Sequence, residues 1–241
     1  MLSKNQLKLV RSLELKKNRR REGLFVAEGP KVVGDLLRAG FKAHAVFSTI
    51  EREGAQQVTE EELRRLSFLQ HPQEVLAVLE IPSDTTSDAS PQPSSLALAL
   101  DGVQDPGNVG TIVRIADWFG IDTIYCSPDT ADVYGPKVVQ ATMGSLAHVH
   151  IFYIDLVQLL SHAKVPIYGT LLDGRNIYEE ELSQNGIIVM GNEGNGISEP
   201  VRRLITKRLL IPNYHVSGNE TAESLNVAIA TAITCAEFRR R

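Results

Sequence analysis

Short apolar runs alternate with segments of helical periodicity along the larger, C-terminal part of the chain. The runs of strand type lie at residues 96–102, 121–127, 149–154, 166–172, 186–191 and 209–212. The segments of helical type lie at residues 108–120, 136–147, 155–163, 198–205 and 223–238. Apolar strands that alternate with helices are typical of a parallel sheet with both faces covered. We therefore predict an α/β fold with a mostly parallel sheet and helices on both faces.

A change of composition separates this pattern from the start of the chain. The stretch IPSDTTSDASPQPSS is rich in Ser, Asp, Thr and Pro, which is typical of a linker. The segment before it contains a basic helix and a second helical pattern at residues 30–39. It also contains two short strand candidates, at residues 45–49 and 75–81. We predict a small α/β module, a linker and a larger domain, at residues 1–81, 82–95 and 96–241.

Composition excludes several classes of protein. The 241 residues are 43% hydrophobic and 22% charged, which is ordinary for a globular protein and argues against a disordered or fibrous chain. No apolar run reaches the roughly 18 residues of a membrane span, and the first residues lack a signal-type apolar stretch. Cys126 and Cys235 lie in apolar patterns far apart in sequence, so we expect buried thiols, no disulfide framework and no metal site. These features predict a cytoplasmic protein that does not contact membranes.

Positive charge is concentrated at the start of the chain. The net charge is −4, yet residues 1–31 hold nine Lys or Arg and three Glu, a local charge of +6 that leaves −10 for the rest. The densest group is the cluster Lys16, Lys17, Arg19, Arg20 and Arg21. Such a cluster is either the solvated face of a helix or an arm that neutralises RNA phosphates.

Three segments that follow predicted strands carry unusual polar residues, and ligands of parallel sheets bind at such strand ends. In the first, DGVQDPGNVGTIVRIADWFG, Arg114 lies off the apolar stripe of the helix. It either pairs with Asp117 on the surface or points at a phosphate or ribose. Asn108 at the start of this helix is either an N-cap or part of a site.

The second segment is the turn GNEGNG at residues 191–196. Its glycines permit positive φ and a close approach of a ligand to the backbone. Neither G-x-G-x-x-G nor the Gly-Lys-Ser/Thr of a P-loop is present, so a dinucleotide or triphosphate is a poor candidate ligand. Taken alone, such a turn more often has a purely structural role.

The third segment, IPNYHVSGNETAESLNVAIATAITCAEF, ends in an apolar helical pattern. Ser224 and Asn226 flank Leu225 at the start of that pattern. Two polar side chains at the top of an apolar helix either satisfy local backbone groups or face a ligand.

Together these segments resemble the SpoU (TrmH-like) family of RNA ribose 2′-O-methyltransferases, within the SPOUT class. NVGTIVR resembles the first motif of the family, IVMGNEGNGIS the second, and IPN followed by ESLNVAIATAI the third, in the family's order. The opening segment, KNQLKLVRSLELKKNRRREGLFVAEGPKVVGDLLRAG, is similar to the RNA-binding module, related to a ribosomal-protein fold, that precedes many catalytic domains of this family. The stretch NYHVSGNETAE at 213–223 is longer than the usual link in the third motif.

The resemblance implies a C-terminal trefoil knot whose loops hold S-adenosylmethionine, whereas fold rules alone disfavour knots. By motif position, the implied catalytic residues are Asn108, Arg114, Glu193, Ser224 and Asn226. The implied cofactor-binding residues are Thr170, Leu171, Gly191, Asn192, Gly194, Ile211 and Leu225. The basic cluster is then the RNA-binding set.

The resemblance also implies a homodimer through the knot region and methyl transfer to a ribose 2′-hydroxyl of structured RNA, ribosomal RNA more than transfer RNA. The alternatives are a tRNA substrate and a non-catalytic RNA-binding or assembly factor that keeps the fold. A nucleotide-dependent oxidoreductase lacks support because its glycine fingerprint is missing.

Overall fold

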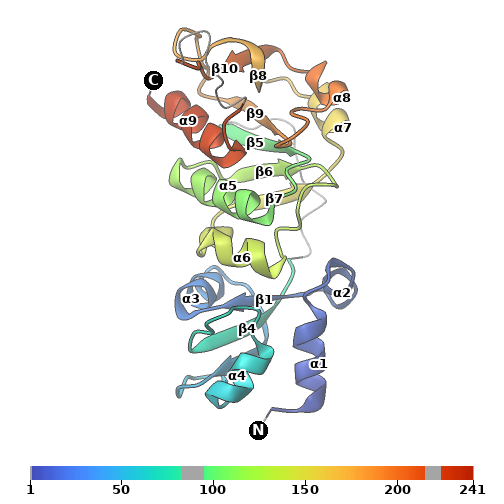
Figure 1. Cartoon of the computed structure of the whole chain (residues 1–241), viewed down its shortest axis with the longest axis vertical. Coiled ribbons are helices and arrows are strands. Elements are labelled where there is room, and N and C mark those ends of the chain that lie inside the picture. Colours follow the sequence, from blue (N-terminus) through green and yellow to red (C-terminus); the bar gives the residue numbers. More distant parts are fainter. Residues whose placement is uncertain (1, 83–94, 215–223, 241) are drawn as a thin grey trace. The chain divides into compact units, whose positions relative to one another are not determined.

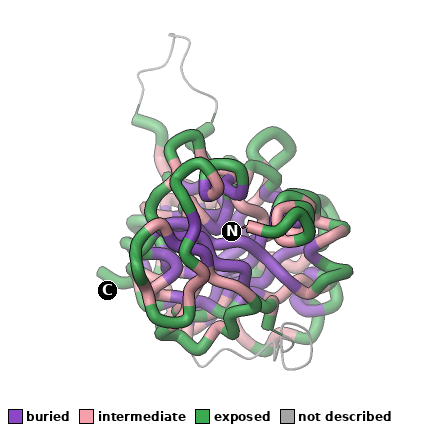
Figure 2. The backbone as a smooth tube through the Cα atoms, turned by 90° about the horizontal axis from the view of Figure 1, so that it is seen from below, coloured by how far each residue is buried: buried purple, intermediate pink, exposed green. Residues whose placement is uncertain are grey.

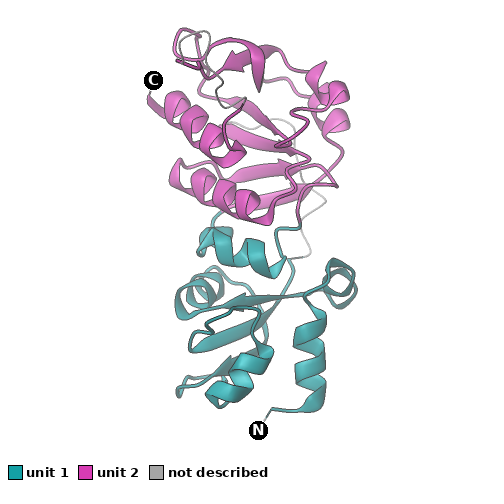
Figure 3. Cartoon of the chain, viewed as in Figure 1, with its two compact units in different colours: residues 1–83, 132–148 teal, residues 84–131, 149–241 magenta. Residues whose placement is uncertain are grey.

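The computed structural model describes residues 2–82, 95–214 and 224–240. The chain forms two compact units, shown in Figure 3: unit 1 comprises residues 1–83 and 132–148, and unit 2 comprises residues 84–131 and 149–241. The expected linker, residues 82–95, lies outside the described residues except for its two ends. The expected domain boundaries stay a prediction, and the units differ from them in placing residues 132–148 with the N-terminal part.

Unit 2 contains the predicted parallel sheet. Its six strands are arranged in the order β10-β8-β9-β5-β6-β7, and every described pair is parallel. The strands are β5 (Leu96–Asp101), β6 (Thr123–Cys126), β7 (His150–Tyr153), β8 (Ile167–Asn176), β9 (Gly186–Gly191) and β10 (Lys207–Leu210). The apolar runs therefore predicted the strands correctly, because strands buried on both faces leave no alternation to mask them.

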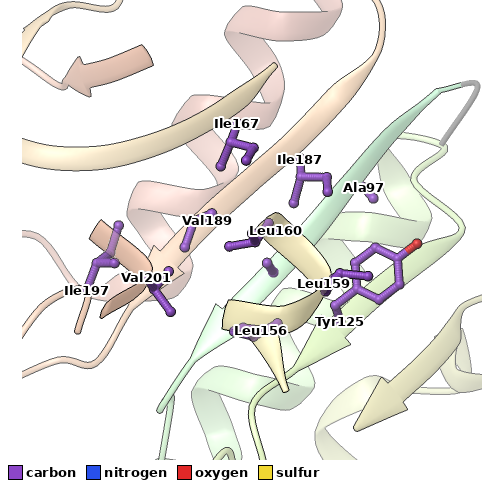
Figure 4. Packing of buried hydrophobic residues seen from close by; sticks show 11 residues of the cluster. Ala97, Tyr125, Leu156, Leu159, Leu160, Ile167, Ile187, Val189, Ile197 and Val201 are labelled. Carbon is purple, nitrogen blue, oxygen red and sulfur yellow. The ribbon is translucent and has the colours of Figure 1, made fainter. Parts of the chain in front are cut away.

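Helices cover both faces of this sheet (Figure 1). The helices in the described part of unit 2 are α5 (Pro106–Trp118), α7 (Leu156–Ser161), α8 (Glu199–Arg202) and α9 (Val227–Arg240). Ile167 packs in the core cluster formed with α7 and α8 (Figure 4), whereas its neighbour Tyr168 meets Phe238 of α9 with ring centroids 4.8 Å apart. Adjacent strand residues point to opposite faces, so α9 lies on the face opposite to α7 and α8.

Unit 1 is a small α/β module with a four-stranded sheet in the order β1-β4-β2-β3. Its strands are β1 (Leu24–Glu28), β2 (Ala43–Ser48), β3 (Gln56–Gln57) and β4 (Val75–Glu80). Its helices are α1 (Lys4–Ser12), α2 (Lys16–Glu22), α3 (Pro30–Arg38), α4 (Glu60–Leu66) and α6 (Pro136–Thr142), with a short 3₁₀ turn at Ser145–Ala147. The strands β2 and β4 match predicted segments, whereas β1, β3 and α4 were not predicted.

The buried residues of both units follow their strands, which form the purple interior of Figure 2. In unit 1 the fully buried Phe25 of β1 meets Tyr134 of the segment 132–148, with ring centroids 5.0 Å apart. That segment also contributes the buried Val138 and Val139 of α6. None of the described helices is long and apolar enough to cross a membrane.

Candidate functional site

A cavity of about 830 Å³ opens in unit 2 between the middle of β8, the turn after β9, the segment after β10 and the start of α9. It lies beside the carboxyl ends of these parallel strands, where ligands of such sheets bind. All seven residues predicted to contact a cofactor line it: Thr170, Leu171, Gly191, Asn192, Gly194, Ile211 and Leu225. Glu193 and Ser224 line it as well. Binding of a cofactor by these residues stays a prediction, but the structure brings them to one place.

An irregularity in β8 shapes one wall of the cavity. Gly169 pairs with Arg208 of β10, but the next pair joins Leu209 to Arg175, so residues 170–174 of β8 have no partners in this ladder. At Gly174 an added Cβ would lie 2.4 Å from the backbone carbon of Leu209. Only glycine permits this close approach. The part of β8 without partners in the ladder lines the cavity through residues 170–173.

The glycine-rich turn is held in a fixed shape by its own backbone and by Asn192. The backbone groups of Asn192 and Gly196 exchange two hydrogen bonds of 2.9 Å. The Asn192 Oδ1 accepts from the backbone N–H of Gly194 and Asn195 at 2.9 and 3.0 Å, and its Nδ2 donates to the Gly102 carbonyl at 2.7 Å. The turn is therefore a preorganised hairpin, in which Asn192 has a structural part that its motif position did not predict.

At Gly191, any other residue would force the neighbouring backbone to shift. A Cβ at Gly191 would lie 2.3 Å from the backbone carbon of Gly196 and 2.4 Å from the backbone nitrogen of Ile197. At Gly194, by contrast, a Cβ would meet only Asn192 Oδ1, at an ordinary 3.5 Å. The spacing of the glycines thus reflects a tight backbone crossing at one end and an open tip at the other.

Three of the predicted catalytic residues form one hydrogen-bonded chain. Asn108 Nδ2 donates to Glu193 Oε1 at 2.9 Å, and Asn108 Oδ1 accepts from Asn226 Nδ2 at 2.9 Å. These residues are far apart in sequence and come from α5, the glycine-rich turn and the start of α9. The N-cap of α5 is Asp105, whose side chain accepts from the backbone N–H of Asn108. The alternative role of Asn108 as N-cap is therefore wrong, and its side chain is free to join the loops.

Asn226 both satisfies local backbone groups and bonds to another predicted site residue. Its Oδ1 accepts from the backbone N–H groups of Ala228 and Ile229, at 2.9 and 3.3 Å, and so caps α9. Its Nδ2 remains available for the bond to Asn108. Ser224 lies at the edge of the cavity, directly after residues 215–223, which lie outside the described part of the chain and hold most of the long 213–223 link.

Arg114 stands apart from this chain of hydrogen bonds. Its side chain is exposed on α5, and it forms no hydrogen bond or ion pair with any residue that the structure describes. The alternative of a surface pair with Asp117 is therefore not observed. A long, unpaired cation on an exposed helix face can reach a phosphate, which is the geometry that a role towards RNA requires.

A charged group at the rim of the cavity was not predicted. Asp173 Oδ2 accepts from Arg202 Nη2 at 2.7 Å and from Arg208 Nη1 at 2.9 Å. Partial desolvation works in the opposite direction, but the charges of Arg202 and Arg208 lower the pKa of Asp173 below its ordinary value. The three residues lie in different elements, so no local pattern could have found this group.

The predicted RNA-binding cluster divides into exposed and buried members. Lys17, Arg20 and Arg21 are exposed and Lys16 is half-buried. Arg19 is only 4% exposed and its guanidinium binds Asp132 and two backbone carbonyls. The prediction for Arg19 is corrected accordingly, because a side chain buried among such partners cannot also contact RNA.

Other candidate chemistry is limited. Within residues 2–82, 95–214 and 224–240, no group of three or more His, Cys, Asp or Glu side chains is placed to hold a metal ion. Cys126 and Cys235 are both free and buried, and burial raises the pKa of each thiol, to about 12 for Cys235. Raised thiol pKa values describe inert core residues.

Comparison with known proteins gives two matching family models. The SpoU rRNA Methylase family matches residues 95–236, and the MRM3-like substrate binding domain matches residues 4–77. A curated relative, 23S rRNA (guanosine(2553)-2′-O)-methyltransferase RlmP of Bacillus subtilis, is 30% identical over 98% of this chain and 97% of its own.

Solved structures agree with these matches. The AdoMet-bound rRNA methyltransferase from Sinorhizobium meliloti is 32% identical, with a TM-score of 0.88 over 100% of this chain and 96% of its own. The SpoU methyltransferase AviRb from Streptomyces viridochromogenes, in complex with AdoMet, is 25% identical, with a TM-score of 0.83 over 99% and 98%. The similarity therefore extends over both units.

Proposed function

Because the chain belongs to the SpoU rRNA methylase family, we propose that it transfers a methyl group from S-adenosylmethionine to a ribose 2′-hydroxyl of RNA. The observation that carries this proposal is the site itself. A cavity lined by the glycine-rich turn lies next to a hydrogen-bonded chain of Glu193, Asn108 and Asn226. Transfer between two bound molecules depends on their positioning, and this site provides fixed groups on three separate elements.

The cavity fits S-adenosylmethionine better than a phosphate cofactor. Its wall combines apolar side chains, such as Leu171, Ile211 and Leu225, with the backbone of the glycine-rich turn. The acidic Glu193 in that turn would repel phosphate but is compatible with a cation and with amine or hydroxyl donors. At Gly191 the two backbones approach so closely that a Cβ would not fit. We assign Thr170, Gly191 and Gly194 to cofactor contacts through their backbones, together with Asn192.

In the proposed mechanism, S-adenosylmethionine supplies a methyl group attached to a sulfonium, which is a good leaving group. Transfer would form a bond between the ribose 2′-oxygen and the methyl carbon while the carbon–sulfur bond breaks with its electron pair on sulfur, and the hydroxyl proton would pass to water. Arg114 grips the neighbouring phosphate and polarises the hydroxyl, since an arginine with a pKa above ~12 is a poor base. Ser224 and Asn226 orient the ribose, and Glu193 holds Asn108 in the position that Asn226 also contacts.

For the substrate, we propose ribosomal RNA ahead of transfer RNA. Supporting observations are the match of residues 4–77 to a substrate-binding domain and the names of relatives that act on 23S rRNA. One similar protein, from Synechocystis, is named only as a tRNA/rRNA methyltransferase. The cytoplasmic location expected for such a substrate is part of the same proposal.

Methyl transfer to unmodified transcripts tests the reaction and the substrate together. Transcripts of 23S rRNA and of a tRNA set are incubated with labelled S-adenosylmethionine and then hydrolysed in alkali. A 2′-O-methylated ribose lacks the nucleophile for alkaline cleavage, so label in alkali-resistant dinucleotides of 23S rRNA is the expected result. Label in tRNA alone contradicts the choice of substrate. Cofactor binding without transfer to either RNA favours the non-catalytic RNA-binding alternative.

We also propose that the chain forms a homodimer through the outer face of α5 and α9. These helices pack against each other in unit 2 (Figure 1), and Ile115, Trp118, Ile229 and Ile233 lie on their outward sides. Trp118 is 85% exposed and Ile229 is 53% exposed. Large exposed apolar side chains on adjacent helices are typical of an interface. The expected trefoil knot near this region stays a prediction.

Light scattering tests the dimer. The wild-type chain should show twice the monomer mass, and Trp118→Glu should show the monomer mass because a buried, unpaired carboxylate opposes association. A monomeric wild-type protein contradicts the proposal. Trp118 makes no contact with the cavity, so cofactor binding by the variant checks that unit 2 is intact.

A further inference from the structure

Arg19 is buried in the middle of the most basic helix of the chain. Its Nε and Nη2 donate to Asp132 Oδ2, at 3.0 and 2.6 Å, and its Nη1 donates to the carbonyls of Leu13 and Glu14, at 2.7 and 2.8 Å. All of these partners belong to unit 1. The guanidinium therefore ties α2 both to the turn that precedes it and to the segment 132–148.

The helix that Arg19 anchors is weak in isolation. It has seven residues, no side-chain hydrogen bond at its N-cap Leu15, and two cations, Lys16 and Lys17, in its first turn. Short helices are marginal in water, and cations at a helix N-terminus are disfavoured by the helix dipole. Besides the four hydrogen bonds of Arg19, Asn18 Nδ2 donates to the Ser12 carbonyl at 2.8 Å. The order of α2 therefore depends on bonds to residues outside the helix.

The Arg19 side chain faces away from the exposed cations of α2. At about 100° per residue, Lys17, Arg20 and Arg21 lie between about 100° and 200° round the helix from Arg19, in agreement with their exposure. A side chain that fixes one side of α2 thus orders the backbone that carries three cations on the other side, one of which, Arg21, also binds Glu22 at 2.8 Å. A backbone that is already ordered loses less conformational entropy when its cations bind phosphate.

We propose that the Arg19–Asp132 pair is a positioning device for RNA binding, which holds α2 so that Lys17, Arg20 and Arg21 form a preorganised phosphate-binding face. This inference rests on the proposed RNA substrate. The pair joins the two stretches of the chain that match different family models. Arg19 lies in the stretch that matches the substrate-binding domain, and Asp132 lies in the stretch that matches the methylase family. The methylase stretch thereby contributes a residue to the substrate-binding unit.

Asp132→Asn should change RNA affinity in opposite directions under the two explanations, a positioning role and a purely electrostatic one. Removal of an acidic charge strengthens RNA binding if charge alone matters. In the structure, one oxygen of Asp132 accepts from Arg19 and the other from the backbone N–H of Tyr134, and an Asn side chain cannot serve both. We therefore expect weaker binding of a 23S rRNA transcript, by about tenfold, the loss from one additional residue that orders on binding. The matched control is Glu53→Gln, an exposed acid of unit 1 without this contact.

A charge-conserving pair of variants gives the second test. Arg19→Lys keeps the charge but cannot reach Asp132 and two carbonyls at once, so RNA binding should weaken while the slope of log affinity against log salt stays unchanged. Arg20→Lys, on the exposed side of α2, should leave affinity nearly unchanged. In Arg20→Ala the slope should fall by about 0.7 to 0.9, as for one lost phosphate contact.

The outcomes distinguish failure of this inference from failure of the proposed function. Cofactor affinity and the unfolding temperature are measured for every variant, because unit 2 should be unaffected. Failure of the wild type to bind the transcript contradicts the proposed RNA substrate. If the wild type binds it but Arg20→Ala and Lys17→Ala change neither affinity nor slope, the RNA-binding face itself is wrong. If they do, but Asp132→Asn and Arg19→Lys bind RNA as tightly as the wild type, the positioning role is refuted. A reduced slope in Arg19→Lys also refutes it, since that result indicates direct contact with RNA.

Discussion

Replacement of Asn108 by Asp tests whether the chain of hydrogen bonds holds the site together. In the structure, Asn108 donates to Glu193 at 2.9 Å and accepts from Asn226 at 2.9 Å. Asn108→Asp keeps the shape and the bond from Asn226, but it removes the donor that faces Glu193 and places a second carboxylate there. The substitution thus changes one interaction from attraction to repulsion and leaves the rest of α5 as it is.

The size of the effect follows from the distance. Two unit charges 2.9 Å apart repel by about 1.4 kcal/mol at the dielectric constant of water, which suits these exposed side chains. Loss of the hydrogen bond adds about 1 kcal/mol. The sum, about 2.5 kcal/mol, corresponds to a fall of about 60-fold in kcat/KM for RNA if the reaction needs this geometry.

A second substitution provides the control. In the double variant Asn108→Asp with Glu193→Gln, the new amide can donate to the new carboxylate, so the bond is restored with its direction reversed. Methyl transfer measured at neutral pH should recover most of the lost activity in the double variant. A single variant within threefold of the wild type, or a double variant no better than the single one, refutes the idea that this bond positions the site.

Three further predictions concern separate features. Arg114→Ala should reduce methyl transfer by about 10² to 10³ while the Kd for S-adenosylmethionine, measured by calorimetry, stays the same; loss of both together contradicts the phosphate role. Gly191→Ala should lower stability by about 1–3 kcal/mol and abolish cofactor binding, whereas Gly194→Ala, with room for its Cβ, should keep the Tm of the wild type in thermal unfolding. Burial raises the pKa of Glu28 above its ordinary value of 4.5, although the hydrogen bonds from Ser67 and Phe68 act in the opposite direction. The folded protein therefore binds this proton more tightly than the unfolded chain, and the stability that the proton contributes is lost as pH rises through the folded pKa. Glu28→Gln should therefore flatten the fall in Tm above pH 4.5, and an unchanged pH profile would show that Glu28 does not cause it.

The sheet and its helices could be predicted from sequence because each rests on local periodicity. The central strands β5 and β9 are buried on both faces, and helices such as α5 have a clear apolar stripe. The long helical pattern at 136–147 was also recognised, but it gave no sign that α6 packs in unit 1. Packing partners depend on contacts between distant segments, which periodicity does not encode.

The site could be predicted only in part, for similar reasons. Motif resemblance predicts Asn108, Glu193 and Asn226 as site residues, and the structure adds that Glu193 and Asn226 both bind Asn108. The group formed by Asp173, Arg202 and Arg208 escaped notice because ordinary surface residues carry it. Arg19 was misread since a buried and an exposed arginine look alike within a run of cations.

The grouping of residues 132–148 with the N-terminal unit has a consequence for how the protein is made. Unit 1 is interrupted in sequence between residues 83 and 132, so a ribosome must add 65 residues after Ser83 before His148, the last residue of unit 1, is in the chain. At roughly 5–20 residues per second, this takes about 3 to 13 s. For most of that interval the nascent chain lacks Tyr134, whose ring contacts Phe25, and α6, which packs on β1. We expect the growing chain to need protection of this apolar surface until α6 emerges from the ribosome.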